Sequence, residues 1–128
     1  MENSSLFNFI GKTPLIKTSN IIKNKNITLY LKLEGNNPAG SVKNRPAFNM
    51  IYSALQRNEL KKGDYLIEAT SGNTGIALAM IAKQFGMQIE LVMPENSTKE
   101  RIQTMKAYGA KVNLTSAEGG IEGSRQYA

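Results

Sequence analysis

Two short stretches of this 128-residue sequence combine residue types and spacings that are suited to chemistry. In "EGNNPAGSVKNR", residues 34–45, Lys43 and Arg45 follow a turn rich in glycine and proline, at the predicted first turn of a helix. The positive end of a helix dipole disfavours each cation by about 0.3–1 kcal/mol. Residues that break a local rule in this way concentrate at functional sites, so Lys43 is a candidate reactive group.

The surroundings predicted for Lys43 favour its free amine over its ammonium form. The helix terminus, the neighbouring Arg45 and partial burial all act in this direction. A free lysine amine condenses with an aldehyde to give a Schiff base. Gly35, Pro38 and Gly40 would let the backbone approach a flat cofactor closely, although the same residues also make an ordinary tight turn. A lysine taken at random is a solvated surface residue, and only the position of Lys43 favours the reactive interpretation.

The second stretch is "EATSGNTG", residues 68–75, which follows a predicted strand and opens a predicted helix. Backbone N–H groups and the hydroxyls of Thr70, Ser71 and Thr74 would converge on the positive end of that helix, where anions bind. Ser, Thr and Gly also form plain strand-to-helix turns. The stretch lacks the P-loop lysine and the three-glycine dinucleotide spacing. A carboxylate therefore fits it better than a nucleotide.

Composition excludes several other classes of site. The chain has no cysteine and no histidine, which removes disulfides, the usual zinc sites and Ser/His/Asp nucleophiles, and we expect no metal. Residues 1–62 hold ten Lys/Arg and three Asp/Glu. These scattered cations indicate a solvated face or an anionic small ligand rather than nucleic acid. With no basic leader and no apolar run longer than residues 76–82, we expect a soluble, cytoplasmic protein without a membrane partner.

Alternating strands and helices must position these residues. Strands are predicted at 65–69, 87–93 and 111–116, with helices over 74–85 and 97–108 between them and a further helix from about Gly120. This rhythm is typical of right-handed βαβ units on a parallel sheet, an α/β fold that binds ligands at the carboxyl ends of its strands. Earlier segments add a half-buried strand over 26–34, with Ile27 on its apolar face, and a helix that starts near 42–45 and ends at Gly63. Four methionines are expected in the core: Met80, Met87, Met93 and Met105. A three-stranded sheet with one uncovered side suggests an incomplete fold.

Together with "GKTPLIK" and "MPEN...KERIQTMKAYGAKV", the motifs "NPAGSVKNR" and "EATSGNTGIALA" resemble the cysteine synthases (O-acetylserine sulfhydrylases). The resemblance runs from about residue 6 to residue 128, and "EGNNPAGSVK" is most similar to the B isozyme. These are fold-type II pyridoxal-phosphate enzymes with a tryptophan synthase β-like fold. The resemblance implies that residues 1–128 are an amino-terminal part of such an enzyme. Residues 1–34 would add strands near 13–17 and 27–33 to a large-domain sheet, and residues 35–128 would form the small α/β domain.

The same resemblance assigns roles to the candidate residues. Lys43 matches the lysine that holds pyridoxal 5′-phosphate as a Schiff base and later moves the α-proton. Asn73 matches the asparagine that hydrogen-bonds the ring hydroxyl oxygen of the cofactor, and Thr70, Ser71 and Thr74 match the loop that grips the substrate carboxylate. The implied reaction replaces the acetate of O-acetyl-L-serine with sulfide or thiosulfate through an aminoacrylate, in cysteine biosynthesis. Full-length relatives of this kind are homodimers.

Other interpretations stay open. A related fold-type II lyase, such as a cystathionine β-synthase or a serine/threonine dehydratase, is built in the same way, and a non-catalytic remnant or interaction module would keep the same segments. The phosphate loop, the carboxylate-binding glutamine and the serine that meets the pyridine nitrogen have no match in the chain, so we expect the chain alone to have little or no activity. Asn44 stands where the family commonly has aspartate, which removes a negative charge beside Lys43.

Overall fold

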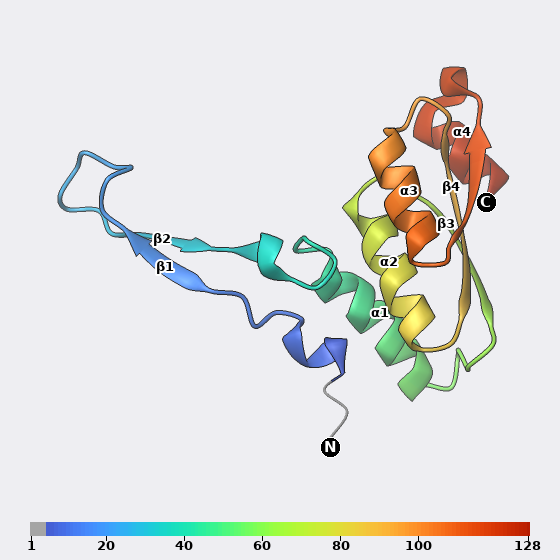
Figure 1. Cartoon of the computed structure of the whole chain (residues 1–128), viewed down its shortest axis with the longest axis horizontal. Helices are drawn as coiled ribbons and strands as arrows, with labels where there is room; N and C mark the ends of the chain where they lie inside the picture. Colours follow the sequence, from blue (N-terminus) through green and yellow to red (C-terminus); the bar gives the residue numbers. More distant parts are fainter. Residues whose placement is uncertain (1–4) are drawn as a thin grey trace.

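The computed structural model of the chain describes residues 5–128 (Figure 1). Its elements, in chain order, are the 3₁₀ helix η1 (Leu6–Phe9), β1 (Leu15–Thr18), β2 (Leu29–Lys32), η2 (Glu34–Asn36), α1 (Asn44–Gln56), β3 (Tyr65–Ala69), α2 (Asn73–Gln84), β4 (Gln88–Pro94), α3 (Lys99–Ala107), β5 (Lys111–Thr115), η3 (Ala117–Gly119) and α4 (Gly120–Tyr127). The predicted absence of a basic leader and the start of the range 1–34 involve residues 1–4, which lie outside the described residues.

Strands β3, β4 and β5 form a parallel sheet in that order. Ile67 of β3 pairs with Glu90 of β4, which in turn pairs with Lys111 of β5. Helix α2 connects β3 to β4, helix α3 connects β4 to β5, and the two helices pack against each other on one face of the sheet (Figure 1). The predicted α/β fold of βαβ units on a parallel sheet is confirmed.

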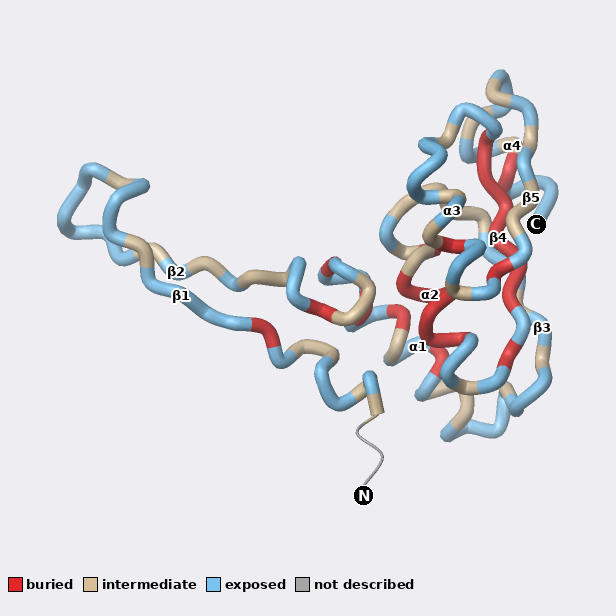
Figure 2. The backbone as a smooth tube through the Cα atoms, viewed as in Figure 1, coloured by how far each residue is buried: buried red, intermediate tan, exposed pale blue. Residues whose placement is uncertain are grey.

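The hydrophobic core lies between this sheet and helices α2 and α3, and α1 packs against α2. Figure 2 shows the buried backbone concentrated in α2 and β4. Every residue of Ala77–Ala82 is buried, as the apolar composition of this helix predicts. The four methionines predicted in the core are all buried, with exposed fractions of 2%, 5%, 0% and 0% for Met80, Met87, Met93 and Met105.

The other face of the sheet is partly covered by α4. The Ser124 hydroxyl lies 2.7 Å from the Thr115 hydroxyl, and the Tyr127 hydroxyl accepts a hydrogen bond of 2.8 Å from Asn113. Side chains alternate along a strand, so Asn113 and Thr115, two residues apart, point to the same face of the sheet. Their contacts with α4 show that this is the face opposite α2 and α3. The prediction of a sheet with one uncovered side is therefore wrong where α4 packs, whereas the helix itself lies where it was predicted.

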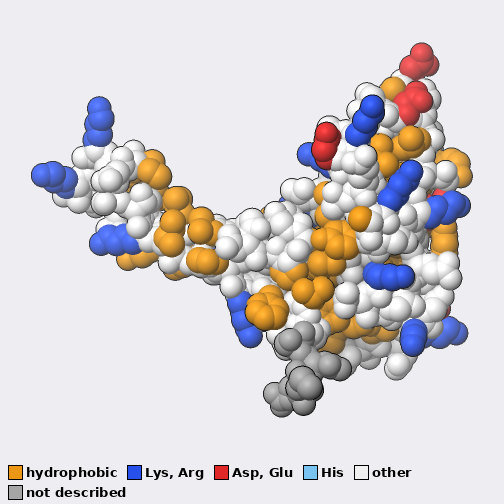
Figure 3. All heavy atoms as spheres, in the orientation of Figure 1, with side chains coloured by type: hydrophobic (Ala, Val, Ile, Leu, Met, Phe, Trp, Pro, Cys, Tyr) orange, Lys and Arg blue, Asp and Glu red, His pale blue; other side chains and the backbone are white. Residues whose placement is uncertain are grey.

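Residues 11–33 form a hairpin that extends away from the rest of the molecule (Figures 1 and 2). Strands β1 and β2 pair antiparallel as a separate two-stranded sheet, with Leu15 opposite Lys32. Strand β2 alternates between half-buried and exposed residues as predicted, but Ile27 lies outside the strand and is exposed, contrary to the prediction. Figure 3 shows hydrophobic side chains along this arm and lysines at its far end. The large exposed hydrophobic residues of the hairpin are Leu15, Ile16, Ile21, Ile27 and Tyr30.

Helix α1 ends earlier than the sequence pattern predicts. Its last residue is Gln56 rather than a residue next to Gly63. Asn58 has a φ of 58°, a left-handed conformation that asparagine tolerates better than most residues. The N–H of Glu59 then donates to the carbonyl of Ala54 at 2.9 Å, which closes the end of the helix. The missed signal is this asparagine, which acts as the helix terminator.

Candidate functional site

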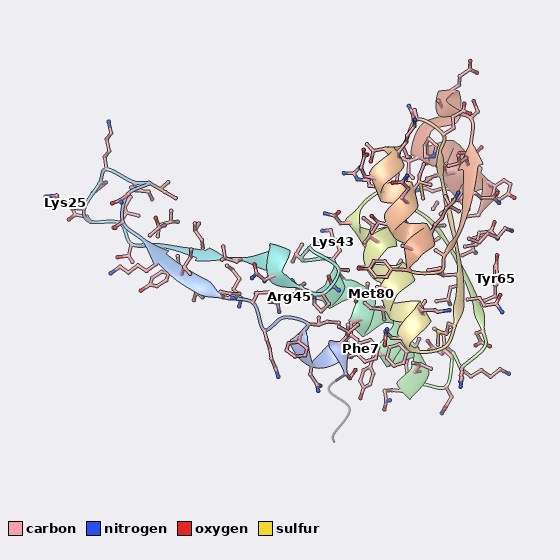
Figure 4. The ribbon with its side chains drawn as sticks, in the orientation of Figure 1. Phe7, Lys25, Lys43, Arg45, Tyr65 and Met80 are labelled. Atoms are coloured by element: carbon pink, nitrogen blue, oxygen red, sulfur yellow. The ribbon has the colours of Figure 1, made fainter. Side chains whose placement is uncertain are left out.

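The two motifs singled out in the sequence lie at the starts of two neighbouring helices. Helices α1 and α2 pack against each other, with Ala47 and Ile51 of α1 buried in the shared core. The helices run in the same direction, so their amino-terminal ends lie at the same end of the pair (Figure 1). Lys43 is the residue before α1, and Gly72 is the residue before α2. Figure 4 marks Lys43 at this end of the helix pair.

The turn before α2 presents hydroxyl groups and free backbone donors. Thr70 is tied to the sheet by its N–H, which donates to the carbonyl of Val92 at 3.0 Å. Thr70, Ser71 and Thr74 are half-buried, and Asn73 is exposed. No side chain caps the start of α2, and its first N–H groups have no partner within the helix. The turn therefore has the donors that an anion requires.

Lys43 is exposed at the start of α1. Its backbone N–H donates to the Ser41 hydroxyl at 3.2 Å, and its carbonyl accepts from Ala47 at 3.1 Å. Within residues 5–128, the amine of Lys43 makes no ion pair closer than 4.0 Å. The predicted partial burial of Lys43 is wrong, because the turn at 38–42 leaves its side chain open to solvent. The position predicted for it at the helix start is confirmed.

Arg45 does not act as a free second cation beside Lys43. Its guanidinium forms a two-pronged ion pair with Glu34, in which Nη2 lies 2.8 Å from Oε1 and Nε lies 2.9 Å from Oε2. The Arg45 bonds, with those from Thr13 and Asn37, lower the pKa of Glu34 from its ordinary value of 4.5 to about 2. The second cation that the sequence placed beside Lys43 is therefore paired with the Glu34 carboxylate.

Asn44, between these two residues, is fully buried. Its Oδ1 accepts a hydrogen bond of 3.2 Å from the N–H of Ala39, while its Nδ2 has no partner within the described residues. Buried polar atoms are rarely left unpaired. The sequence offered Asn44 only as a departure from a family pattern, and its contact with Ala39, five residues earlier, was not predicted.

A second polar cluster lies on the sheet face under α4, and sequence reasoning missed it. Glu90 is 5% exposed, and its carboxylate accepts hydrogen bonds from Lys111 at 2.8 Å, from Asn113 at 2.6 Å and from the Tyr65 hydroxyl. The bonds from Lys111 and Tyr65 lower the pKa of Glu90, and the bond to Glu90 raises the pKa of Tyr65. Glu90 stands in an apolar run, and its partners come from neighbouring strands that no local pattern identifies.

Other kinds of site find no support in the part of the chain that the structure describes. Residues 5–128 contain no group of three or more His, Cys, Asp or Glu side chains that could hold a metal ion. No helix in this range has the length and apolar character needed to cross a membrane. An apolar groove of about 200 Å³ lies beside β3, lined in part by Met50, Leu66 and Ile67. None of the predicted site residues lines it.

Known proteins resemble this chain over nearly its whole length. A family described as pyridoxal-phosphate dependent enzyme matches residues 6–128. Cysteine synthase B of Escherichia coli (strain K12) is 54% identical over 125 residues, which cover 98% of this chain and 41% of that protein. Cysteine synthase B of Pseudomonas syringae pv. syringae is 50% identical over 128 residues, which cover 100% of this chain and 76% of that protein.

Solved structures agree with these relatives. The crystal structure of cysteine synthase (OASS) from Entamoeba histolytica superposes with a TM-score of 0.91 at 38% identity, covering 97% of this chain and 38% of that one. The cystathionine beta-synthase of Bacillus anthracis gives a TM-score of 0.78 at 36% identity, covering 98% of this chain and 47% of that one. The chain thus spans less than half the length of both proteins. Since the family match extends over residues 6–128 and the fold is shared, the chain belongs to the pyridoxal-phosphate dependent enzymes.

Proposed function

We propose that the protein is a cysteine synthase, a transferase that uses pyridoxal 5′-phosphate to replace the acetate of O-acetyl-L-serine with sulfide or thiosulfate. The observation that carries this assignment is that Lys43 and the hydroxyl-rich turn from Thr70 to Thr74 stand at the same end of the packed helices α1 and α2. Relatives named cysteine synthase B, at 54% and 50% identity, support the class of reaction.

In this proposal Lys43 holds the cofactor covalently through Nζ and later removes the proton from the α-carbon of the substrate. The bound cofactor supplies the electron sink for the bond cleavage. Two features support the role of Lys43. Its side chain is exposed, and its backbone is held at the start of α1 by hydrogen bonds to Ser41 and Ala47. A reactive amine needs both access to its partner and a fixed point of attachment.

The hydroxyls of Thr70, Ser71 and Thr74 bind the substrate carboxylate in this proposal, and Asn73 donates a hydrogen bond to the ring hydroxyl oxygen of the cofactor. The absence of a side-chain cap at the start of α2 supports these roles. A carboxylate at this position gains about 0.3–1 kcal/mol from the helix dipole, in addition to its charge-assisted hydrogen bonds.

The residues near these helix starts fit a flat, anionic group. A Cβ atom added at Gly35, Gly40 or Gly72 would meet nothing within 4 Å, so the backbone is open to close approach there. Asn44, next to Lys43, keeps a buried Nδ2 without an acceptor in the described residues. Unpaired donors and open backbone suit a cofactor that is rich in acceptor oxygens.

A second candidate is a related lyase of the cystathionine β-synthase kind. The similarity to the Bacillus anthracis cystathionine beta-synthase, with a TM-score of 0.78, favours keeping it. The leaving group does not separate the two candidates, because a cystathionine beta-synthase of Helicobacter pylori is described as O-acetylserine dependent. They differ in the sulfur compound that is added, so assays that offer sulfide and homocysteine in parallel, and that measure cysteine against cystathionine, discriminate between them.

We also infer that the hairpin of β1 and β2 joins a larger sheet, that residues 35–128 form the small domain, and that the protein acts as a cytoplasmic homodimer. An isolated two-stranded sheet is marginally stable in water. The exposed Leu15 and Ile16 on β1 supply apolar surface for a neighbouring element, and their exposed fractions of 61% and 43% support this inference.

The decisive experiment is to incubate the 128-residue chain with pyridoxal phosphate, reduce it with borohydride and locate the modified lysine by peptide mass mapping. We expect selective labelling of Lys43 and its loss in Lys43→Arg. The matched control is Lys25→Arg, at the exposed far end of the hairpin (Figure 4), which should not change the labelling of Lys43. O-acetylserine added before reduction should lower the yield at Lys43. Labelling scattered over surface lysines would reject the assignment.

A further inference from the structure

The loop that leads to Lys43 is closed by a network of side chains that we call the Glu34 clasp. Glu34 precedes the loop, and Arg45 follows it. Arg45 Nη2 and Nε donate to the two carboxylate oxygens of Glu34 at 2.8 and 2.9 Å. The same carboxylate accepts from the Thr13 hydroxyl at 2.9 Å and from Asn37 Nδ2 at 2.9 Å. The clasp therefore joins the start of the hairpin, the loop and the first turn of α1.

The geometry of the clasp makes it stronger than an ordinary surface ion pair. Two parallel N–H···O bonds between a guanidinium and a carboxylate fix the relative orientation of both groups. The side chains of Glu34 and Arg45 are 22% and 41% exposed, so water competes only in part. Each oxygen of Glu34 also has a neutral donor, Thr13 on one side and Asn37 on the other. The two oxygens of the Glu34 carboxylate thus accept four hydrogen bonds.

Gly11 makes room for the guanidinium. Arg45 Nη2 donates to the carbonyl of Gly11 at 3.0 Å, and a Cβ atom at Gly11 would stand 2.6 Å from Arg45 Nη1. Gly11 also has a φ of 78°, which disfavours any residue with a side chain. The N–H of Gly11 donates to Asn37 Oδ1 at 2.8 Å. The clasp therefore also includes the backbone of Gly11, whose carbonyl accepts from Arg45 and whose N–H donates to Asn37.

Lys43 stands inside this closed segment. On one side of Lys43 in the chain, Asn37 donates a hydrogen bond to Glu34, and on the other side Arg45 forms its ion pair with the same carboxylate. The neighbouring Asn44 accepts a hydrogen bond from the N–H of Ala39. None of these bonds uses the side chain of Lys43. The arrangement fixes the backbone from which the amine extends and leaves the amine itself accessible.

We propose that the Glu34–Arg45 clasp is a positioning device for Lys43. This inference rests on the proposed function in one respect, that Lys43 is the lysine that holds the cofactor. The side chains of Arg45 and Glu34 bond to each other and to Gly11, Thr13 and Asn37. They act by holding the loop and the first turn of α1, and thereby the attachment point of the amine.

The test compares variants of the clasp with variants of a matched ion pair. Arg45→Lys keeps the charge and loses the two-pronged geometry, Glu34→Gln removes the acceptor charge, and Gly11→Ala displaces the guanidinium. The controls are Arg57→Lys and Glu59→Gln, because Arg57 and Glu59 form a similar pair, with bonds of 2.7 and 2.7 Å, at the other end of α1. The chain is measured in two ways, by ¹⁵N relaxation of the Lys43 amide and by the rate of borohydride-fixed pyridoxal phosphate at Lys43. Circular dichroism confirms that each variant is folded under the same conditions.

We expect faster motion of the Lys43 amide and a rate of labelling about tenfold lower in Arg45→Lys and Glu34→Gln, since small misplacements of reacting groups cost up to about 100-fold in rate. The Arg57 and Glu59 controls should match the unmodified chain. An Arg45→Lys variant that is folded and keeps both the order and the labelling rate of Lys43 would overturn the inference, because charge alone would then suffice.

Failure of the proposed function gives a different result. If the unmodified chain labels no lysine selectively, the assignment of Lys43 fails. The relaxation data still decide the clasp, since they require no cofactor: unchanged order at Lys43 in all three clasp variants rejects it, and increased motion in them but not in the Arg57 control supports it.

Discussion

Gly75 and Thr70 lie so close together that any side chain at position 75 would force its neighbours to move. A Cβ atom on Gly75 would stand 2.7 Å from Cγ2 of Thr70 and 2.9 Å from Cε of Met105, shorter than any normal contact. The first turn of α2 therefore packs directly on the turn that precedes it. The glycine of the motif is required for this close packing, and the position of the Thr70 hydroxyl depends on it.

Gly75→Ala should destabilise the chain by about 1–2 kcal/mol. Overpacking costs about 1–3 kcal/mol, and the better helix propensity of alanine offsets up to about 1 kcal/mol of it. Urea unfolding followed by circular dichroism measures the change. Gly123→Ala in α4 is the control, because a Cβ atom there meets nothing within 4 Å, and it should be neutral or stabilise. Equal stability of both variants would contradict the close contact.

Asn58 should respond to substitution through its backbone rather than its side chain. The φ of Asn58 is 58°, a left-handed conformation that costs residues with an ordinary Cβ about 1–2 kcal/mol. Asn58→Ala should therefore lower the free energy of unfolding by about 1 kcal/mol. Asn58→Gly should be neutral or stabilising. The free energies of unfolding in urea test this, and an alanine variant as stable as the glycine variant would show that the helix ends by another mechanism.

The Glu34 clasp should make folding stability depend on pH in acid. The pKa of Glu34 falls from 4.5 to about 2 in the folded chain, mainly through the Arg45 bonds, so the folded state binds fewer protons than the unfolded state between these values. Its contribution to stability is complete above pH 4.5 and is lost as the pH falls towards 2. Unfolding midpoints measured at pH 5 and pH 3 should differ more in the unmodified chain than in Glu34→Gln. Arg45→Gln should flatten the profile in the same way.

Tyr65 should ionise above its ordinary range. Its hydroxyl donates to the Glu90 carboxylate, which raises its pKa above 10. The folded state keeps this proton longer than the unfolded state, so the contribution of Tyr65 to stability is lost as the pH rises from 10 through the higher folded value. The difference between the alkaline absorbance titrations of the unmodified chain and Tyr65→Phe isolates this group. In Glu90→Gln the transition should move to lower pH.

The sequence predicted the parallel sheet well because each of its elements carries a local signal. Helix α2 is apolar nearly all round, and the strands around it are short apolar runs bounded by turns, so their types follow from periodicity alone. The end of α1 could not be predicted in this way. Gly63 is the more familiar terminator, but the chain turns at Asn58 because Glu59 and Ala54 close the helix first.

The candidate site was predictable in position but not in contacts. Lys43 and the turn at 70–74 lie at helix starts, as their glycine and hydroxyl neighbours indicate. The partners of Arg45 were not predictable, because Glu34 and Gly11 lie 11 and 34 residues away along the chain. Arg45 is a cation at a helix start, where the helix dipole disfavours it, and this position suggested a role in catalysis. In the structure Arg45 forms an ion pair with the Glu34 carboxylate. Only a three-dimensional arrangement distinguishes the two.

The parallel orientation of α1 and α2 also affects the stability of the folded chain. Two aligned helices place about half a positive charge each at one end, which repel each other until a negative group arrives. Any molecule that binds only the folded form raises its stability, by about 2.7 kcal/mol when its concentration is 100 times its dissociation constant. A negatively charged ligand bound at this end would therefore stabilise the folded chain and slow its cleavage by proteases that attack the unfolded form.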